Sequence, residues 1–157
     1  MRWGAERRTG QDLTEGIRAQ VQPCYAGAVS GTPRTPFRVL FVDDDSATRE
    51  GYRAFLAGCG YDVTPAATGI EALSLASTSA PDVIVLDLGL PDIDGWEVAR
   101  RLRAVPGTLA IPIIALTGSD REQERASAMR AGCDRHLGKP CVPADLVDAI
   151  RRCLKQT

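Results

Sequence analysis

The sequence predicts an α/β fold in which five strand–helix units surround one parallel sheet. Short apolar runs alternate along the chain with segments of helical periodicity, which is typical of βα units. The runs are nearly continuous rather than alternating with polar residues, as expected for strands that helices cover on both faces. The three clearest runs are Val39 to Val42, Val83 to Leu86 and Ile111 to Leu116.

Two weaker runs complete the set of five strands. The run Tyr61 to Ala66 contains Pro65, which has no N–H to donate to a neighbouring strand, so this strand is expected at an edge of the sheet. The fifth strand is short and covers Asp134 to Leu137.

The helices are indicated by apolar spacing and by their end residues. Tyr52, Phe55, Leu56 and Cys59 follow the i, i+3, i+4, i+7 spacing of one buried helix face. The expected first residues and caps are Asp45 or Ser46, Thr68 with Glu71, Asp94 with Glu97, Ser119 with Glu122, and Pro143 for the last helix. Gly132 suits the end of the fourth helix.

Length and composition are those of one soluble domain. The chain has 157 residues, 44% hydrophobic and 25% charged, with a net charge of -1 that gives no argument for nucleic-acid binding. Residues 1–36 lack periodicity and are expected to form a flexible N-terminal extension before a folded domain at residues 37–157.

Membrane and redox roles are not expected. No stretch approaches the roughly 18 apolar residues of a membrane helix, and the N-terminus lacks the apolar region of a secretory signal, so we expect a cytoplasmic protein. The five cysteines contain no C-x-x-C pair and are expected to be reduced thiols: Cys24, Cys59, Cys133, Cys141 and Cys153.

Three carboxylates follow two of the apolar runs. Asp43 and Asp44 come directly after the first run, and Asp87 comes directly after Leu86. Ligand sites of open parallel sheets lie beyond the carboxyl ends of the strands, so the three acids converge if the two strands are neighbours. Clustered carboxylates favour a hard divalent cation, and Mg²⁺ also suits phosphoryl transfer, in which a carboxylate can be the nucleophile.

Donors for phosphoryl oxygens are expected at the same edge. Thr117 closes the run that ends at Leu116, and Lys139 follows the fifth strand. A hydroxyl and an ammonium group there would stabilise the oxygens of a transferring group, and Gly118 leaves room for it to enter.

The ordered segments VLFVDDD, VIVLDLGLPDIDG, IPIIALTG and GKP resemble the response-regulator receiver family over Phe37 to Leu154. The resemblance implies a flavodoxin-like, doubly wound (βα)5 sheet with strand order 2-1-3-4-5. It also implies that Asp87 is the phosphorylation site, that Asp43 and Asp44 bind Mg²⁺, and that the carbonyl of Gly89 completes the metal shell.

By the same resemblance, Thr117 is the switch hydroxyl, Lys139 binds phosphate, and the peptide bond before Pro140 is cis. Two positions depart from the family, which commonly has aromatic residues where this chain has His136 and Cys141. We expect packing or a partner contact for His136 and packing for Cys141, although His136 could also make the switch pH-sensitive.

The expected role is that of a signalling switch rather than a metabolic enzyme. The phosphoryl group would come from a histidine kinase or a histidine phosphotransfer protein, or slowly from a small acyl phosphate. A downstream protein would then read the surface formed by the fourth helix, the fifth strand and the fifth helix, unless the chain is a phosphorelay intermediate. No DNA-binding pattern is evident, so no direct DNA binding is expected.

Two other functions share features with this sequence. A small phosphatase of the HAD type also forms an aspartyl phosphate and opens with Asp-x-Asp, which Asp43 to Asp45 satisfies, but Ala47 stands where that family has Thr or Val. A degenerate receiver that binds partners without phosphorylation is disfavoured by the intact acidic set.

Overall fold

The computed structural model describes residues 36–118 and 122–155 of the chain. The extension expected at residues 1–36 lies outside this range except for Pro36, as do Cys24 and the cap expected at Ser119, and these expectations stay predictions. No helix in the described ranges combines the length and apolarity needed to cross a membrane.

Five parallel strands form one sheet in the order β2-β1-β3-β4-β5, which confirms the expected fold class and strand order. The strands are β1 (Arg38–Val42), β2 (Asp62–Ala66), β3 (Val83–Asp87), β4 (Ile113–Thr117) and β5 (Arg135–Gly138). Pro65 lies on the edge strand β2, as expected. Each strand differs from its predicted run by one or two residues at one or both ends; β3 includes Asp87, for example, and β4 begins at Ile113 rather than Ile111.

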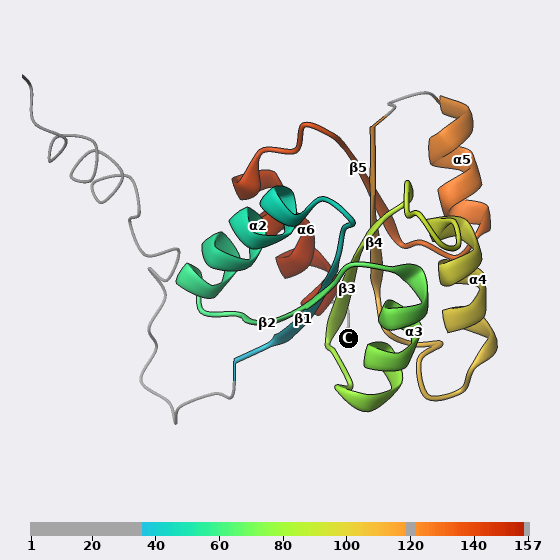
Figure 1. Ribbon diagram of the computed structural model, residues 1–157, viewed down its shortest axis with the longest axis horizontal. Helices are drawn as coiled ribbons and strands as arrows, with labels where there is room; N and C mark the ends of the chain where they lie inside the picture. The colour runs from blue at the N-terminus through green and yellow to red at the C-terminus, as the bar shows by residue number, and fades with distance from the viewer. Residues whose placement is uncertain (1–35, 119–121, 156–157) are drawn as a thin grey trace, which may run out of the picture. The chain divides into compact units, whose positions relative to one another are not determined.

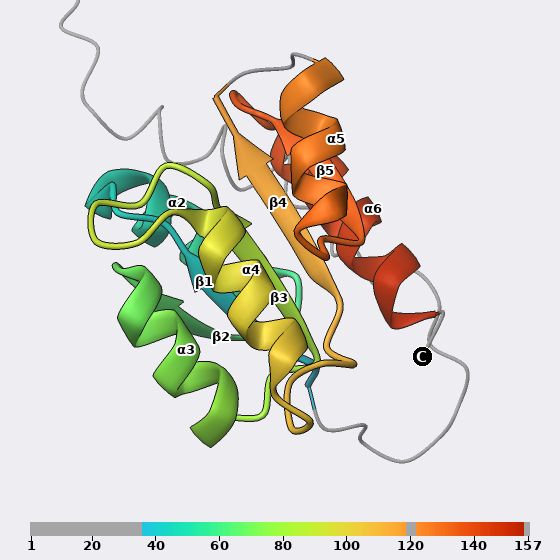
Figure 2. The ribbon, with the colours of Figure 1, turned by 90° about the vertical axis from the view of Figure 1, so that its right-hand side faces the viewer.

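Helices cover both faces of the sheet (Figures 1 and 2). They are α2 (Ser46–Gly58), α3 (Gly69–Thr78), α4 (Gly95–Ala104), α5 (Glu122–Arg130) and α6 (Pro143–Leu154). Helices α2 and α6 lie on one face, where Leu56 and Ile150 pack in one cluster. Helices α3, α4 and α5 lie on the other face, where Ala72, Val98 and Ala128 pack in a second cluster.

The strands supply both clusters because successive side chains point to opposite faces. In β1, Val39 and Phe41 face α2 and α6, whereas Leu40 and Val42 face α3 and α4. All four side chains are fully buried. The apolar runs of the sequence are therefore continuous because helices cover both faces of the sheet.

Most of the expected helix ends are confirmed. The carboxylates of Asp45 and Asp94 accept hydrogen bonds from the third residue of α2 and α4, and Thr68 does the same for α3. Gly132 has a φ of +102°, and its amide and that of Cys133 close the end of α5 in a Schellman motif.

Candidate functional site

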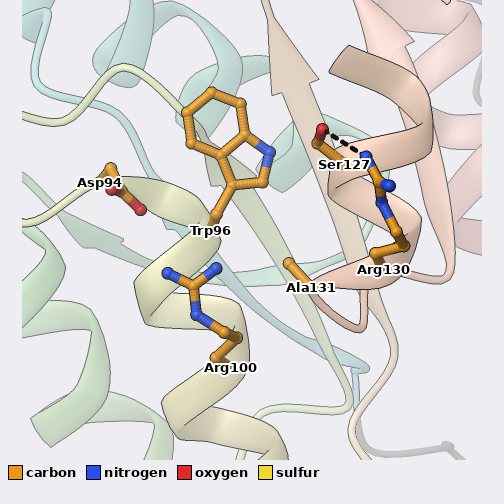
Figure 3. A pocket seen from close by; sticks show the side chains of 6 residues that line it. All are labelled: Asp94, Trp96, Arg100, Ser127, Arg130 and Ala131. Atoms are coloured by element: carbon orange, nitrogen blue, oxygen red, sulfur yellow. Dashed lines mark hydrogen bonds between the residues drawn. The ribbon is translucent and has the colours of Figure 1, made fainter. Parts of the chain in front are cut away.

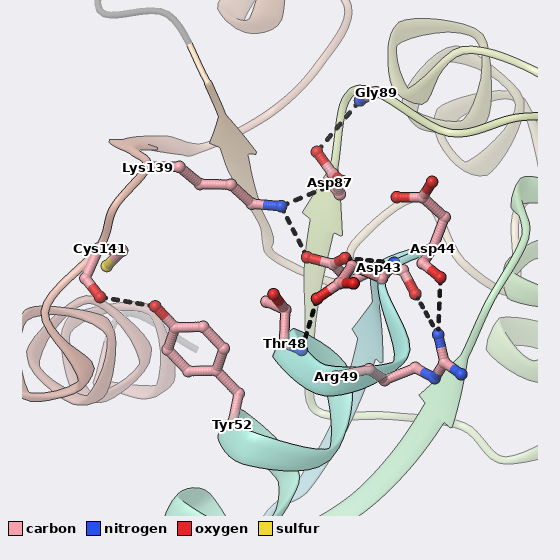
Figure 4. Close-up of polar contacts among 10 residues, drawn as sticks. Asp43, Asp44, Thr48, Arg49, Tyr52, Asp87, Gly89, Lys139 and Cys141 are labelled. Atoms are coloured by element: carbon pink, nitrogen blue, oxygen red, sulfur yellow. Dashed lines mark hydrogen bonds and ion pairs between the residues drawn. The ribbon is translucent and has the colours of Figure 1, made fainter.

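The three predicted carboxylates meet at the carboxyl edge of the sheet (Figure 4). Strands β1 and β3 are neighbours, and one carboxylate oxygen each from Asp43, Asp44 and Asp87 lie within 4.8 Å of one another. Asp43 is fully buried and Asp87 is 6% exposed, whereas Asp44 is exposed. The cluster is therefore open to solvent on the Asp44 side.

Backbone amides orient two of these acids. The amide of Asp45 donates to Oδ1 of Asp43 at 2.9 Å, and the amide of Gly89 donates to Oδ1 of Asp87 at 3.1 Å. In addition, the amide of Asp43 donates to the carbonyl of Ala66 on β2, which fixes the chain just past the end of β1. Each carboxylate is thus held in place by the turn that follows its strand.

Lys139, just after the edge strand β5, also contacts the acids. It follows β5, and its Nζ donates to Oδ2 of Asp43 at 2.7 Å and to Oδ2 of Asp87 at 3.1 Å. Burial opposes the charged ammonium, but the two carboxylates raise the pKa of Lys139 above its ordinary value. The lysine is therefore a permanent positive charge beside Asp87. The peptide bond that follows it, before Pro140, is cis, as the family resemblance implied.

Thr117 lies at the end of β4, next to Asp87 on β3. Its partner across the sheet is Gly138, and its carbonyl accepts a 2.6 Å hydrogen bond from the amide of Lys139. The hydroxyl of Thr117 donates to Oε2 of Glu124 on α5 at 2.9 Å. A Cβ added to Gly118 would meet nothing within 4 Å, so this glycine does leave space beside Thr117.

Sequence reasoning missed three residues that support the site. Arg49 on α2 donates to the carbonyl of Asp43 at 2.7 Å and to that of Asp44 at 3.3 Å, and so fixes the turn that carries both acids. The second is Glu124, the partner of Thr117. No motif marks either residue, although Arg49 stands one helical turn after the cap Asp45, where a long donor can reach back.

The third missed residue is Asp92, in the loop after β3. Its two carboxylate oxygens accept 2.8 Å hydrogen bonds from the amides of Gly69 and Ile70, at the start of α3. Desolvation alone would raise the pKa of Asp92, but these amides lower it to about 2. Asp92 therefore fastens the loop that leads from Asp87 to α4.

Gly95 allows that loop to turn back closely onto β3. A Cβ at this position would lie 2.6 Å from Cα of Leu88 and 2.7 Å from the carbonyl oxygen of Asp87. Backbone atoms cannot move aside as a flexible side chain can. Only glycine therefore fits here without displacing Asp87.

The donor set fits a magnesium ion. Asp43, Asp44 and Asp87 offer hard, charged oxygen ligands, and the exposed side of the cluster can supply water. No other cluster of three or more acidic, histidine or cysteine ligands occurs among the residues that the structure describes.

The cysteines and His136 take no part in this acidic cluster. The cysteines in the described ranges are thiols, and burial raises the pKa of Cys133 to about 11 and that of Cys141 above its ordinary value, which disfavours the reactive thiolate. The backbone carbonyl of Cys141 accepts a 2.6 Å hydrogen bond from the hydroxyl of Tyr52. His136 is half-buried on β5, and its Nε2 has no hydrogen-bond partner among the residues that the structure describes.

A separate hollow of about 390 Å³ lies between α4 and α5 (Figure 3). It is lined by Asp94, Trp96, Arg100, Ser127, Arg130 and Ala131. Trp96 packs against the core at the start of α4. The hollow contains none of the predicted site residues, and it separates part of α5 from α4.

The sequence and structure of this chain are similar to those of response regulators. The response regulator receiver domain model matches residues 39–151. Response regulator MprA of Mycobacterium sp. (strain KMS) is 43% identical over 122 residues, which are 78% of this chain and 52% of that protein. The chain thus spans about half the length of the curated relatives it matches.

Two solved structures have the same fold. Chemotaxis response regulator CheY4 of Vibrio cholerae has a TM-score of 0.73 and 32% identity, covering 76% of this chain and 100% of that one. The receiver domain of sensor histidine kinase PA1611 from Pseudomonas aeruginosa PAO1, which has a magnesium ion coordinated in its active site cleft, has a TM-score of 0.72 and 32% identity, covering 76% and 98%. The chain therefore belongs to the response regulator receiver domain family, whose members act in phosphorylation-based two-component signalling.

Proposed function

We propose that Asp87 accepts a phosphoryl group in a Mg²⁺-dependent reaction and that the resulting aspartyl phosphate is the signal. The observation that carries the proposal is the double contact of Lys139 Nζ with Asp43 and Asp87, inside a cluster of three carboxylates. Three carboxylates and one ammonium leave a net negative charge, so the cluster suits a divalent cation, and the cation together with Lys139 would then attract the oxygens of a phosphoryl group.

The residues divide the work as follows. Asp43, Asp44 and Asp87, with the carbonyl of Gly89, would hold Mg²⁺, and the bound ion would neutralise charge on the phosphoryl oxygens. A carboxylate oxygen of Asp87 forms the new O–P bond while the bond from phosphorus to the donor's imidazole nitrogen, or to acetate, breaks. The ammonium of Lys139 and the hydroxyl of Thr117 donate to the phosphoryl oxygens, and water later hydrolyses the aspartyl phosphate.

The arrangement of Asp43 to Asp45 supports Asp87 rather than Asp43 as the nucleophile. Both oxygens of each carboxylate accept one hydrogen bond, so hydrogen bonding does not distinguish the two acids. Burial does, because Asp43 is fully buried whereas Asp87 is 6% exposed and is the more accessible of the two to an incoming phosphoryl group. The carboxylate of Asp45 caps α2, where hydrogen bonds from Thr48 lower its pKa, so the second acid of an Asp-x-Asp phosphatase signature is engaged elsewhere. The phosphatase alternative is accordingly disfavoured.

We further propose that the donor is the phosphohistidine of a histidine kinase or histidine phosphotransfer protein, and that a downstream protein reads the surface of α5, β5 and α6. Two hydrogen bonds support this surface: Thr117 donates to Glu124 on α5, and Lys139 after β5 donates to Thr117. A role as a phosphorelay intermediate would use the same chemistry. The absence of direct DNA binding and the cytoplasmic location stay predictions from the sequence.

Labelling with acetyl phosphate and Mg²⁺, followed by mass mapping of the peptides, tests the proposal. The expected label is on Asp87, lost in Asp87→Asn and in excess EDTA but retained in the control Asp148→Asn, which removes an exposed carboxylate of α6 outside the cluster. A label on Asp43 would point to the phosphatase. Partner binding and labelling that are indifferent to Asp87→Asn would favour a degenerate receiver. A transfer screen against phosphorylated kinases then identifies the donor.

A further inference from the structure

Helix α5 is anchored to the rest of the domain by few buried groups. Ala128 is its only buried side chain among those that the structure describes, whereas α6 buries five residues. Ala128 is also small, so it contributes little apolar area to the packing. Tertiary packing normally supplies most of the stability of a helix in a protein. Polar contacts therefore matter more for the position of α5 than for that of α6.

Two unsatisfied nitrogens lie on the sheet face that α5 covers. Nε1 of Trp96 and Nε2 of His136 are the buried side-chain nitrogens or oxygens without a hydrogen-bond partner in the described ranges. Trp96 lines the hollow beside Ser127 of α5 (Figure 3). His136 points to the face opposite Leu137, which packs in the α2 and α6 cluster. Neither nitrogen makes a hydrogen bond to α5 in the described ranges, so neither ties that helix to the rest of the domain.

Glu124 provides a polar contact from α5 to the end of β4. Its Oε2 accepts a hydrogen bond of 2.9 Å from the hydroxyl of Thr117, which is 4% exposed, and Glu124 itself is half-buried. Hydrogen bonds to an ionised acceptor are stronger than neutral ones. The contact thus couples the strand end beside Asp87 to the helix.

The hydroxyl of Thr117 has only one hydrogen to donate. While that hydrogen is directed to Glu124, it cannot be directed to an oxygen of a phosphoryl group on Asp87. The two hydrogen bonds are mutually exclusive, so each favours a different state of the site. We propose that Glu124 is a positioning residue, a latch that holds Thr117 and α5 in the unphosphorylated arrangement and releases both when Asp87 is phosphorylated.

The latch rests on the proposed function and adds a regulatory consequence to it. Only molecules in which the Thr117 hydroxyl is free of Glu124 can bind a phosphoryl group or its mimic fully. The apparent affinity is therefore lowered in proportion to the fraction of molecules in which the Thr117–Glu124 hydrogen bond is formed. Release of Glu124 also removes a polar anchor of α5, so the helix gains freedom to shift when the site is filled. Glu124 therefore sets how strongly the unphosphorylated protein resists activation.

The latch is tested with beryllofluoride and Mg²⁺, a mimic of the aspartyl phosphate, by titration calorimetry on the full chain. Glu124→Ala is expected to bind the mimic about three- to tenfold more tightly than wild type. This is less than a fully buried hydrogen bond to a charged group would give, because Glu124 is half-buried and regains water when it is released. Glu124→Gln keeps an acceptor oxygen but loses the charge, so its affinity should lie between the two. Gln123→Ala, an exposed neighbour on α5, should match wild type.

The Thr117→Val background separates a latch from other effects of the substitution. The gain from Glu124→Ala should disappear there, because no hydroxyl remains to be released. An equal gain in both backgrounds would mean that the charge of Glu124 alone repels the anion, and no gain in either would mean that the hydrogen bond is only structural; both results overturn the latch. Loss of beryllofluoride binding in Asp87→Asn checks the proposed function separately. If wild type itself does not bind, that function is refuted and the latch with it.

Discussion

Replacing Lys139 by methionine should destabilise the protein and, at the same time, strengthen its binding of Mg²⁺. Methionine keeps the apolar stem of the side chain and removes the ammonium that contacts Asp43 at 2.7 Å and Asp87 at 3.1 Å. Asp43, which is fully buried, and Asp87, which is 6% exposed, then lie beside each other and Asp44 without a compensating positive charge. The substitution therefore isolates the electrostatics of the site.

The size of the loss follows from the burial of the ion pair. Breaking a fully buried pair by removing one partner costs about 3–5 kcal/mol, but the Lys139 side chain is 26% exposed and water screens part of the interaction. We expect the free energy of unfolding to fall by about 2 kcal/mol at neutral pH without Mg²⁺. Mg²⁺ should bind Lys139→Met about three- to tenfold more tightly, because the ammonium no longer repels the cation, and saturating Mg²⁺ should narrow the difference in stability.

Urea unfolding with and without Mg²⁺, together with titration calorimetry of Mg²⁺, measures both effects. The chain contains only one other lysine, Lys155, which lies exposed after α6, so Lys155→Met is the matched control and should leave both quantities unchanged. An unfolding free energy of Lys139→Met equal to that of wild type, or an unchanged or weaker Mg²⁺ affinity, would refute the electrostatic account of the site.

Three further outcomes are expected. Gly95→Ala should cost about 2 kcal/mol of unfolding free energy and slow acetyl phosphate labelling, since its Cβ would lie 2.7 Å from the carbonyl oxygen of Asp87. Gly51→Ala, with open space around it on α2, should instead stabilise the protein by about 0.5–1 kcal/mol. Chemical denaturation that ranks the two variants in the opposite order would contradict this account of the packing at Gly95. The pKa of Asp92 is lowered to about 2 in the folded protein, so its contribution to stability is present above the ordinary carboxyl pKa near 3.8 and is lost as pH falls from there toward 2. The unfolding free energies of wild type and Asp92→Asn in urea should therefore differ at pH 7 and converge near pH 2. A difference that persists at pH 2 would oppose this assignment. Tyr52→Phe should lose about 1 kcal/mol of unfolding free energy, because the partly buried carbonyl of Cys141 loses its 2.6 Å hydrogen bond. Equal thermal stability of Tyr52→Phe and wild type would count against this contribution.

The sheet and the acidic cluster could be predicted because both follow from short-range features of the chain. Continuous apolar runs mark strands with two covered faces, and the residues just after them must lie at one edge of a parallel sheet. The bounds were less accurate where a run alone decided them. Pro112 cannot donate a hydrogen bond, so β4 begins at Ile113, and β3 includes Asp87 because its pairing with β4 continues to Leu116.

The supporting contacts could not be predicted because they depend on how elements approach one another. Asp92 reaches the start of α3 across 22 and 23 residues of sequence, and no local pattern marks that contact. The choice between Gln123 and Glu124 as the partner of Thr117 depends on the rotation of α5 over the sheet. In a helix with few apolar residues, periodicity does not fix that rotation.

A crystal structure of the protein with Mg²⁺ and beryllofluoride tests the central claim most directly. The account predicts beryllofluoride on the carboxylate of Asp87 in contact with Lys139 and Thr117, and the cation on Asp43, Asp44 and Asp87. Beryllofluoride attached to Asp43, or a cation bound without Asp87, would contradict it.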